Sequence, residues 1–466
     1  MTVATRRVEM SSPATRARLL QSPPGTGRPG PAPRRVVLDV ALAVVGLGFG
    51  ATVGVALTAE RVSELHARGG IAMFLGNLTG LTGTYLALVM VLLVSRVPAV
   101  ERVLGQDGLL RWHRRLAPWP ISLIVAHAVL LTYAFAEVAR VGILHEIGVF
   151  VSSYSGMLLA LIGFGVLVVI AILSIYSVRR LLRRETWWAI HLGMYLAFAL
   201  AFAHEIALGP SFVGHPLTLA LWSAAWAATA GLVLVYRFGL PLYRTLYHDL
   251  RVHEVRTEAD GVVSVVMRGR HLDRLRFSGG QFFEWRFIAP KLWWHSHPYS
   301  LSARPRPPFV RLTARAVGVH SAALGQLRPG TRVVVEGPYG AFTAHARRHR
   351  KVAFVMGGIG VTAVRSLLED LAPGCDPVVI WRVTSPDGAV LRDEVEPLVS
   401  HLGGRLELLE GPRSAVTLDE IASHIPELSE RDVYVCGRDG FVQEMTGVIE
   451  RLGAPADSIH YEVYAL

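Results

Sequence analysis

The chain has 466 residues, a net charge of +11, and 52% hydrophobic against 18% charged residues. This composition is too apolar for one soluble domain and too polar for a chain embedded throughout in a bilayer, so we expect a mixed protein of about three domains. Its two cysteines, Cys375 and Cys436, exclude a disulfide framework and an iron–sulfur cluster held by this chain alone, because the usual clusters need four thiolates. The arginines cluster beside apolar stretches and no nucleic-acid-binding module is visible, which favours a membrane over nucleic acid as the partner of the positive charge.

The N-terminal half is organised by apolar stretches. Residues 1–35 are rich in Arg, Pro, Ser and Gly without an apolar block, so we expect a disordered tail. Six apolar stretches follow, each close to the 17–25 residues or so with which a helix crosses a bilayer. They are residues 36–59, 71–95, 114–136, 149–176, 187–207 and 216–237. The sequence therefore predicts a six-helix transmembrane domain over 36–240.

The arginines predict the orientation of these spans. Six spans leave both termini on the same side of the membrane. Sixteen arginines lie in the tail and in the loops after the second and fourth spans, whereas the opposite loops hold three, Arg61, Arg68 and Arg140. By the positive-inside rule, we expect an integral protein of the cell membrane with a cytoplasmic tail and a cytoplasmic C-terminal portion.

Four histidines on two spans predict a pair of haems. His113 and His127 lie on the third span, and His191 and His204 lie on the fifth. A single histidine in a span is often a hydrogen-bonded packing residue, but ionisable groups inside bilayers are costly and usually mark a site. Imidazole is also a common axial ligand of haem iron. We expect ligands to pair by depth, with His113 and His191 on the inner haem and His127 and His204 on the outer haem.

The spacing on the fifth span does not fit a straight helix. Fourteen residues separate His113 from His127 and return the chain to within about 40° of the same face. The thirteen residues from His191 to His204 fall about 140° short of four turns. A local tightening, a bend near Gly193, or haems approached from different sides would each resolve the mismatch.

Residues 246–346 predict a small antiparallel β-barrel. Stretches of alternating apolar and polar residues are separated there by Gly and Pro turns. They are residues 261–267, 281–285, 309–313 and 332–336. Gly318 and Ser321 precede an expected short helix over 321–327, whose exposed N–H groups suit a pyrophosphate. A routine helix cap is the alternative for this Gly and Ser.

Residues 347–466 predict a doubly wound α/β nucleotide-binding fold. A buried strand at 351–356 leads into a glycine turn at 357–362 and a helix at 363–371. Further strands are expected at 378–382 and 433–436, with helices at 389–402 and 441–452. A glycine turn between strand and helix lets a pyrophosphate approach backbone N–H groups. Its candidate contacts are Gly357, Gly358, Gly360 and Thr362.

Together, several motifs of the spans resemble one family. They are Trp112-His113-Arg114-Arg115, His127, Ser177-Val178-Arg179-Arg180, Glu185, Trp187, Trp188, His191 and His204. This set is similar to the ferric reductase and NADPH oxidase transmembrane family. The resemblance implies a six-helix cytochrome b with two haems b, followed by FAD and NAD(P) domains, from about residue 36 to the end.

The barrel carries a motif that resembles the flavin-binding signature of the ferredoxin reductase superfamily. His297-Pro298-Tyr299-Ser300 implies that Tyr299 packs on the isoalloxazine ring and that the Ser300 hydroxyl bonds near its reactive edge. Many members have Arg where His297 stands, whereas the NADPH oxidase branch has His-Pro. Gly337 begins a Gly-Pro-Tyr-Gly turn similar to the one that closes the family's flavin domain, with a plain strand-ending turn as the alternative.

The C-terminal motifs imply the nicotinamide site. Cys436-Gly437 and the terminal Glu-Val-Tyr resemble family elements that place Cys436 near the nicotinamide and Tyr464 on the flavin until the nicotinamide displaces it. A buried structural thiol is the default interpretation of Cys436. Arg382, after a strand, is a candidate for gripping the 2′-phosphate of NADPH, with Ser385 and Arg413 as helpers, and a solvated surface arginine is its alternative.

These parts predict an NAD(P)H-dependent transmembrane oxidoreductase. Electrons would pass from cytoplasmic NADPH or NADH through FAD and two haems to an acceptor on the outer face. Ferric iron chelates are the favoured acceptor, and reduction of O2 to superoxide is the close alternative. An electron-supplying module for a membrane or periplasmic partner protein, and a haem and flavin redox sensor, are the other readings.

Overall fold

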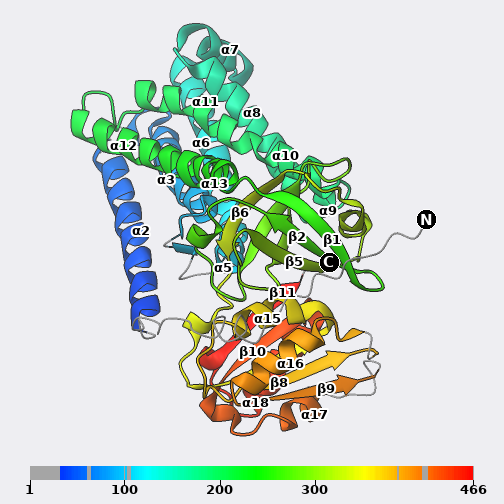
Figure 1. Cartoon of the computed structure of the whole chain (residues 1–466). Helices are drawn as coiled ribbons and strands as arrows, with labels where there is room; N and C mark the ends of the chain where they lie inside the picture. Colours follow the sequence, from blue (N-terminus) through cyan, green and yellow to red (C-terminus); the bar gives the residue numbers. More distant parts are fainter. Residues whose placement is uncertain are drawn as a thin grey trace.

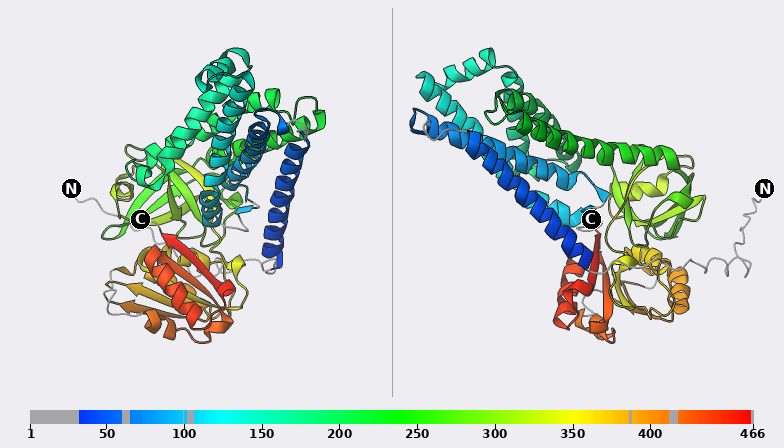
Figure 2. Two further views of the ribbon diagram at one scale, coloured as in Figure 1. Left: turned by 180° about the vertical axis from the view of Figure 1, so that it is seen from behind. Right: turned by 90° about the vertical axis from the view of Figure 1, so that its left-hand side faces the viewer.

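The computed structural model describes residues 32–59, 65–98, 100–101, 106–385, 388–411 and 418–464. Within them the chain forms a bundle of helices, then antiparallel sheets, then a parallel sheet with its own helices (Figure 1). Both sheet regions gather at one end of the bundle (Figure 2), which we term the sheet end. Residues 1–31 of the expected tail lie outside the described residues.

Within the described residues, six helices are long and apolar enough to cross a membrane, as predicted. They span Leu38–Ala59, Gly70–Val94, Gly108–Ala139, Met157–Ser174, Thr186–Leu208 and Pro216–His248. The helices that build them are α2 (Ala32–Ala59), α3 (Gly70–Val94), α5 (Gln106–Leu116), α6 (Pro118–Ala139), α8 (Met157–Ser174), α10 (Arg184–His191), α11 (Gly193–Leu208), α12 (Pro216–Leu232) and α13 (Leu240–His248). Shorter helices α7 (Ile143–Ser153) and α9 (Tyr176–Arg179) flank the fourth span.

Four span boundaries differ from the expected ones. The apolar run 149–176 is not one helix, because α7 ends at Ser153 and Gly156 adopts a left-handed backbone (φ 78°) before α8 begins. The third span starts earlier than residue 114, so His113 lies inside it. The sixth continues past residue 237 through a π-helix, Val233–Gly239, into α13. Helix α2 begins at Ala32, within the last residues of the expected tail.

Glycines bring the histidine-bearing helices close to their neighbours. On α3, a Cβ added at Gly76, Gly80 or Gly83 would collide with side chains of α6. On α8, a Cβ added at Gly163 would lie 2.7 Å from the carbonyl oxygen of Ala197 on α11. Small residues spaced by three or four let transmembrane helices approach closely. These contacts hold α6 and α11 against α3 and α8.

The barrel consists of two three-stranded antiparallel sheets. One has the order β1 (Arg251–Ala259), β2 (Val262–Arg268) and β5 (Phe309–Arg315). The other has the order β4 (His297–Ser300), β3 (Phe282–Phe287) and β6 (Val333–Tyr339). Bridges from Arg251 to Arg332 and from Leu301 to Leu312 join the sheet edges. A buried core that includes Phe283, Trp285 and Phe287 fills the interior, as alternating strands require.

The last part is a five-stranded parallel sheet, which confirms the predicted doubly wound fold. Its order is β11-β10-β7-β8-β9. The strands are β7 (Lys351–Gly357), β8 (Val378–Val383), β9 (Arg405–Glu410), β10 (Arg431–Arg438) and β11 (Ile459–Tyr464). The helices are α15 (Val361–Leu368), α16 (Arg392–His401), α17 (Leu418–Ser423) and α18 (Asp439–Arg451). The order reverses at β7, so the crevice for a ligand lies beyond the ends of β7 and β10.

Ion pairs fix the barrel against the parallel-sheet domain. Arg311 of β5 donates two hydrogen bonds to Glu394 of α16, at 2.7 and 2.8 Å, and Arg365 of α15 donates a third at 2.8 Å. A Cβ at Gly279 would lie 2.1 Å from the carbonyl oxygen of Ser366, so the two backbones touch. Burial alone would raise the pKa of Glu394, but Arg311 and then Arg365 hold it below its ordinary value of 4.5.

Glu394→Gln should loosen this interface. Removing the charged acceptor weakens hydrogen bonds that contribute about 1.5–3 kcal/mol each when one partner is ionised. A carboxyl with a lowered pKa stabilises the fold above its ordinary pKa and loses that contribution as the pH falls. We therefore expect a lower unfolding temperature of the full chain at pH 7 and a weaker loss of stability below pH 4.5. Glu396→Gln, on the exposed side of the same helix, is the matched control, and equal melting of the two variants would contradict the expectation.

Candidate functional site

The structure brings the four span histidines together in two pairs. The ring centres of His113 and His191 lie 6.3 Å apart, and those of His127 and His204 lie 6.4 Å apart. The first pair joins α5 to α10 near the sheet end, and the second joins α6 to α11 deeper in the bundle. The pairing is the one expected from depth along the spans.

A local tightening of the fifth span resolves its angular mismatch. Helix α10 ends at His191 and α11 begins at Gly193, with Leu192 between them. Leu192 keeps a helical backbone (φ −61°, ψ −22°), and its carbonyl accepts the N–H of Tyr195 at 3.1 Å, three residues further on rather than four, so the helix tightens locally beside Gly193. A Cβ at Gly193 would lie 3.0 Å from a methyl group of Ile170 on α8, so this part of the fifth span packs tightly against the fourth.

Three of the histidines donate Nδ1–H to a backbone carbonyl. His113 bonds Met90 O at 3.2 Å, His127 bonds Gly76 O at 2.8 Å, and His204 bonds Ala201 O at 2.5 Å. The fourth, His191, has Nδ1 3.5 Å from the Ser174 hydroxyl. Such bonds fix the ring orientation and the tautomer of metal-bound histidines, and they leave Nε2 as the basic nitrogen.

The spacing of each pair fits two imidazoles on opposite sides of one metal. A metal–imidazole bond is about 2.0 Å long, so the two bonding nitrogens stand about 4 Å apart and the ring centres about 6 Å apart. Among the described residues, no group of three or more His, Cys, Asp or Glu could hold a metal ion. A pair needs further donors, which the four nitrogens of a porphyrin supply. The donor set therefore fits haem better than a bare ion.

The flavin-signature residues occupy β4 at the edge of their sheet. Ser300 is buried, and among the described residues its hydroxyl has no hydrogen-bond partner. The indole N–H of Trp285 donates to the backbone oxygen of Tyr299 at 2.8 Å. Burial raises the pKa of Tyr299 to about 12, so its phenol is neutral. A buried hydroxyl without a partner fits a ligand atom that would complete it, as the flavin ring does.

The turn at Gly318 uses its serine as a cap. The Ser321 hydroxyl accepts the N–H groups of Val317 and Gly318 at 2.9 and 3.0 Å. The helix that follows, α14 (Val319–Ala323), has only five residues. The cap alternative thus describes the side chain of Ser321, and a phosphate contact at this turn stays a prediction.

A cluster of histidines adjoins the flavin signature. The ring centre of His320, on α14, lies 3.9 Å from the ring centre of His295 and 5.3 Å from that of His297. These contacts bring the Gly318 turn to the start of β4. Gly337, at the end of the third strand of the same sheet, has φ 136°, and its carbonyl accepts a hydrogen bond from Arg244 of α13. The predicted flavin residues therefore surround one sheet of the barrel.

The glycine turn and the C-terminal motifs meet at the crevice. Gly358 has φ 53°, and a Cβ at Gly360 would lie 2.8 Å from the carbonyl oxygen of Cys436. Gly437 follows that cysteine, and a Cβ there would lie 2.8 Å from the ring of Phe441. Gly357 ends β7, beside Arg382 of β8 in the strand register. Gly360 and Gly437 thus have no room for a side chain, whereas a Cβ at Gly358 would meet nothing within 4 Å and the positive φ explains the glycine there.

The end of β11 lies close to both the glycine turn and the barrel. The hydroxyl groups of Thr362 and Tyr464 lie 3.2 Å apart. Burial, with the nearby charge of Glu462, raises the pKa of the Cys436 thiol, so the thiol stays protonated. A Cβ at Gly340 in the barrel would lie 3.8 Å from the carboxylate of Glu462. The end of β11 therefore sits at the junction of the two domains.

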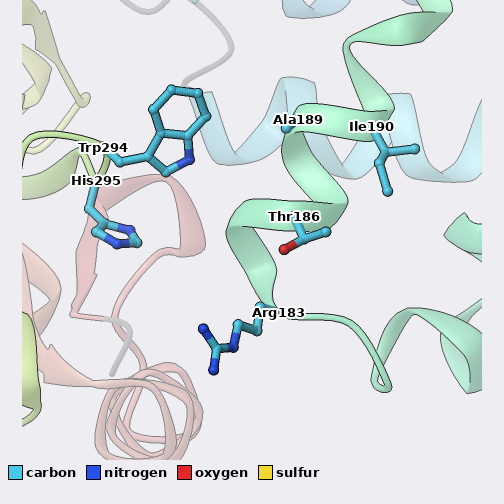
Figure 3. Close-up of a pocket in the computed structure, with 6 residues that line it drawn as sticks. All are labelled: Arg183, Thr186, Ala189, Ile190, Trp294 and His295. Carbon is cyan, nitrogen blue, oxygen red and sulfur yellow. The ribbon is translucent and has the colours of Figure 1, made fainter. Parts of the chain in front are cut away.

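A cavity of about 450 Å³ separates the helices from the barrel. Figure 3 shows Arg183 and Thr186 on the helix side, facing Trp294 and His295. The helix side includes the first turns of α10, which ends at His191. The opposite wall leads into β4 and its flavin signature. The cavity thus lies between the sheet-end histidine pair and the predicted flavin site.

Four remaining groups include Ser385 and Arg413, the two residues predicted to help Arg382, and two that the sequence analysis did not single out as site residues. Ser385 lies just past β8, whereas Arg413 lies outside the described residues. Glu205, next to His204, accepts a hydrogen bond of 3.1 Å from the indole of Trp226. The sequence could have indicated this residue, because an acidic side chain inside an apolar span usually marks a site. Arg96 contacts the barrel, but the sequence singled it out only as one of the arginines that set the orientation of the spans.

Gly80→Ala should displace His127. The added Cβ would stand 2.4 Å from Nδ1 of His127, so the ring must move and lose its bond to the carbonyl of Gly76. Loss of such an orienting bond costs about 10–100-fold in metal affinity. We expect purified protein to lose about one of two haems. Gly50→Ala, at a position with nothing within 4 Å, is the control, and full haem content in both variants would refute the expectation.

Comparison with known proteins supports this organisation. Residues 79–202 match the family model of the ferric reductase like transmembrane component. A flavohemoprotein of Bacillus subtilis is 25% identical over 209 residues, which cover 40% of this chain and 51% of that protein. A terephthalate 1,2-dioxygenase reductase component of Comamonas sp is 26% identical over 185 residues, which cover 36% of this chain and 55% of that protein. The chain thus spans about half the length of these relatives.

Solved structures are also similar to this chain. The FAD/NAD-binding domain of nitric oxide dioxygenase from Vibrio cholerae has a TM-score of 0.40 and 22% identity, and the match covers 47% of this chain and 98% of that one. Flavohemoglobin from Malassezia yamatoensis has a TM-score of 0.42 and 15% identity, over 84% of this chain and 99% of that one. The chain is thus similar to the ferric reductase like transmembrane component over residues 79–202 and, over about 40% of its length, to flavohemoproteins.

Proposed function

We propose that the chain carries electrons from cytoplasmic NAD(P)H through FAD and two haems b to an acceptor on the outer face of the cell membrane. The observation that carries this proposal is the pair of imidazole couples at 6.3 and 6.4 Å, the nearer one beside the predicted flavin site. The arginine asymmetry of the loops supports cytoplasmic termini. The barrel, over 246–346, would hold FAD, and residues 347–466 would hold NAD(P)H.

The chain's own residues prepare the flavin site. When bound, FAD converts the two electrons of a hydride into single electrons, and the haems give those electrons a path across the bilayer. The buried Ser300 hydroxyl is placed to donate a hydrogen bond to the ring edge, and the neutral phenol of Tyr299 to pack on its face.

The nucleotide crevice is built for a pyrophosphate and a nicotinamide. The turn with Gly358 and Gly360 offers backbone N–H groups to the pyrophosphate. Arg382, in register with the end of β7, is placed to bind a 2′-phosphate, which favours NADPH over NADH. Cys436 would border the nicotinamide as a neutral thiol, and Tyr464 would cover the flavin until nucleotide arrives.

The histidine couples hold the haems by orientation rather than by acid–base chemistry. His113 and His191 would ligate the inner haem, and His127 and His204 the outer one. The bonds of His113, His127 and His204 to backbone carbonyls would keep the Nε2 atoms of these three rings basic and able to bind iron. No residue of the chain needs to move a proton for electrons to pass.

Ferric iron chelates are the proposed acceptor. The match of residues 79–202 to a ferric reductase like component supports this choice over O2. Anaerobic assays of the purified chain with NADPH and a ferric chelate should show reduction. If the chain forms superoxide in air but does not reduce the chelate, the proposed ferric reductase is instead an oxidase. If it is active only with a co-expressed membrane protein, it is instead an electron-supplying module.

His127→Ala should remove one haem and interrupt transfer beyond the inner haem. We expect NADPH to reduce the flavin at a rate within about twofold of wild type, while chelate reduction falls at least about tenfold. His145→Ala is the control, because this exposed histidine lies on α7 outside both couples. Two haems in the His127 variant, or no porphyrin in the wild type, would refute the proposal.

A further inference from the structure

A cluster of arginines joins the helical bundle to the barrel at one carboxylate. Arg96, just after α3, donates to the Glu336 carboxylate of β6 and, at 2.6 Å, to the Tyr339 hydroxyl. Its guanidinium stands 4.7 Å from the centre of the Tyr339 ring. The Tyr339 hydroxyl donates to Glu336 at 2.9 Å, and Arg237 of the sixth span lies 3.4 Å from the same oxygen. We name these four residues the junction cluster.

The cluster is partly shielded from solvent. The side chains of Arg96 and Glu336 are 15% and 22% exposed. Arg96 also holds a left-handed backbone (φ 63°), which is unfavourable for a residue with a Cβ. Strain of this kind persists only where the surrounding contacts compensate for it. The contacts with Glu336 and Tyr339 provide that compensation.

The sixth span holds the same strand of the barrel. Arg244 of α13 donates to the carbonyl of Gly337, and the backbone N–H of Val335 lies 3.4 Å from the Thr245 hydroxyl. Contacts from the ends of the second and sixth spans therefore hold strand β6 in place.

On the bundle side, the cluster leads directly to a haem-ligand candidate. Helix α3, which ends at Val94, supplies the carbonyl of Met90 that accepts the Nδ1–H of His113. Arg96 is six residues further along the chain. The helix end that orients the sheet-end histidine couple is thus the one that reaches the barrel.

On the barrel side, the cluster leads to the flavin signature through one sheet. Tyr339 pairs with Phe282 of β3, and Phe282 pairs with Ser300 of β4. Neighbouring strands lie about 4.8 Å apart, so two steps across the sheet separate Tyr339 from Ser300 by about 10 Å. A hydrogen-bonded sheet transmits position with little flexing. One stiff path therefore runs from His113 through Arg96 to Ser300.

We propose that Arg96, Glu336 and Tyr339 are positioning residues that set the separation between the flavin and the inner haem, and with it the rate of electron passage between them. This inference rests on the proposed function. The three side chains touch neither the flavin signature nor the histidine couple; they act by holding one sheet and one helix end together. Small displacements between redox partners change transfer rates steeply, as they do for other reacting groups.

The test follows flavin and haem absorbance separately after anaerobic mixing of the full chain with NADPH. In Arg96→Gln we expect two haems and a flavin reduction rate within about twofold of wild type, with haem reduction slowed at least about tenfold. Glu336→Gln should slow it at least as much, because it leaves Arg96 and Arg237 without their carboxylate. Arg96→Lys, which keeps the charge, should recover part of the rate. Arg268→Gln, at an exposed end of β2, is the matched control.

The double variant gives a further criterion. If the two residues act as a unit, Arg96→Gln with Glu336→Gln should be no slower in haem reduction than the slower single variant. Haem reduction at the wild-type rate in the single variants would overturn the inference. So would a parallel fall in flavin reduction and haem content, which indicates a merely structural role. A wild-type chain whose flavin is reduced by NADPH but whose haems are not would instead overturn the proposed function.

Discussion

Two imidazoles can bind one metal from opposite sides only when their ring centres stand about 6 Å apart. In a bundle of helices this spacing has to be set by the backbones, because histidine side chains are short. The glycines of α3 and α8 supply that control: they bring α6 and α11 so close to their neighbours that the rings have little freedom. At Gly80 the control is direct, since the ring of His127 occupies the space of the missing side chain.

Close contacts also restrict movement between the parts of the chain outside the helical bundle. The barrel is tied to the parallel-sheet domain by Glu394 with its two arginines and by backbone contact at Gly279. It is tied to the bundle by Glu336 with two other arginines. Each junction uses a single carboxylate shared between guanidinium groups, a geometry in which planar donors fix orientation as well as distance. The proposed sites therefore lie along one firmly connected chain of contacts.

The sequence predicted the architecture because its signals are local. Six apolar stretches, the glycine turn after 351–356 and the depth of four histidines required no knowledge of packing. The elements it missed depend on neighbours. Strand β1 and strand β9 are rich in charged residues and become strands by pairing at sheet edges. The split of the fourth span at Gly156 depends on a turn that hydrophobicity does not reveal.

The candidate site divides in the same way. The histidine pairs were predictable, since both members of each pair lie at one depth, but the choice among three geometries for the fifth span was not, because it depends on packing of Gly193 against α8. Ser321 had a local alternative, a helix cap, and its hydroxyl adopts it. Arg96 and Glu336 are 240 residues apart, so their contact leaves no trace in either segment. The flavin, nucleotide and haem roles stay predictions.

The different ring angles of the two imidazole couples have a consequence for the character of the proposed haem sites. The planes of His113 and His191 cross at 79°, whereas those of His127 and His204 cross at 43°. Axial ligation is one of the means by which a protein tunes iron. If each couple held a haem as proposed, the two porphyrins would therefore experience ligand fields of different orientation. The two proposed haem sites would then differ in character although both have the same pair of imidazole ligands.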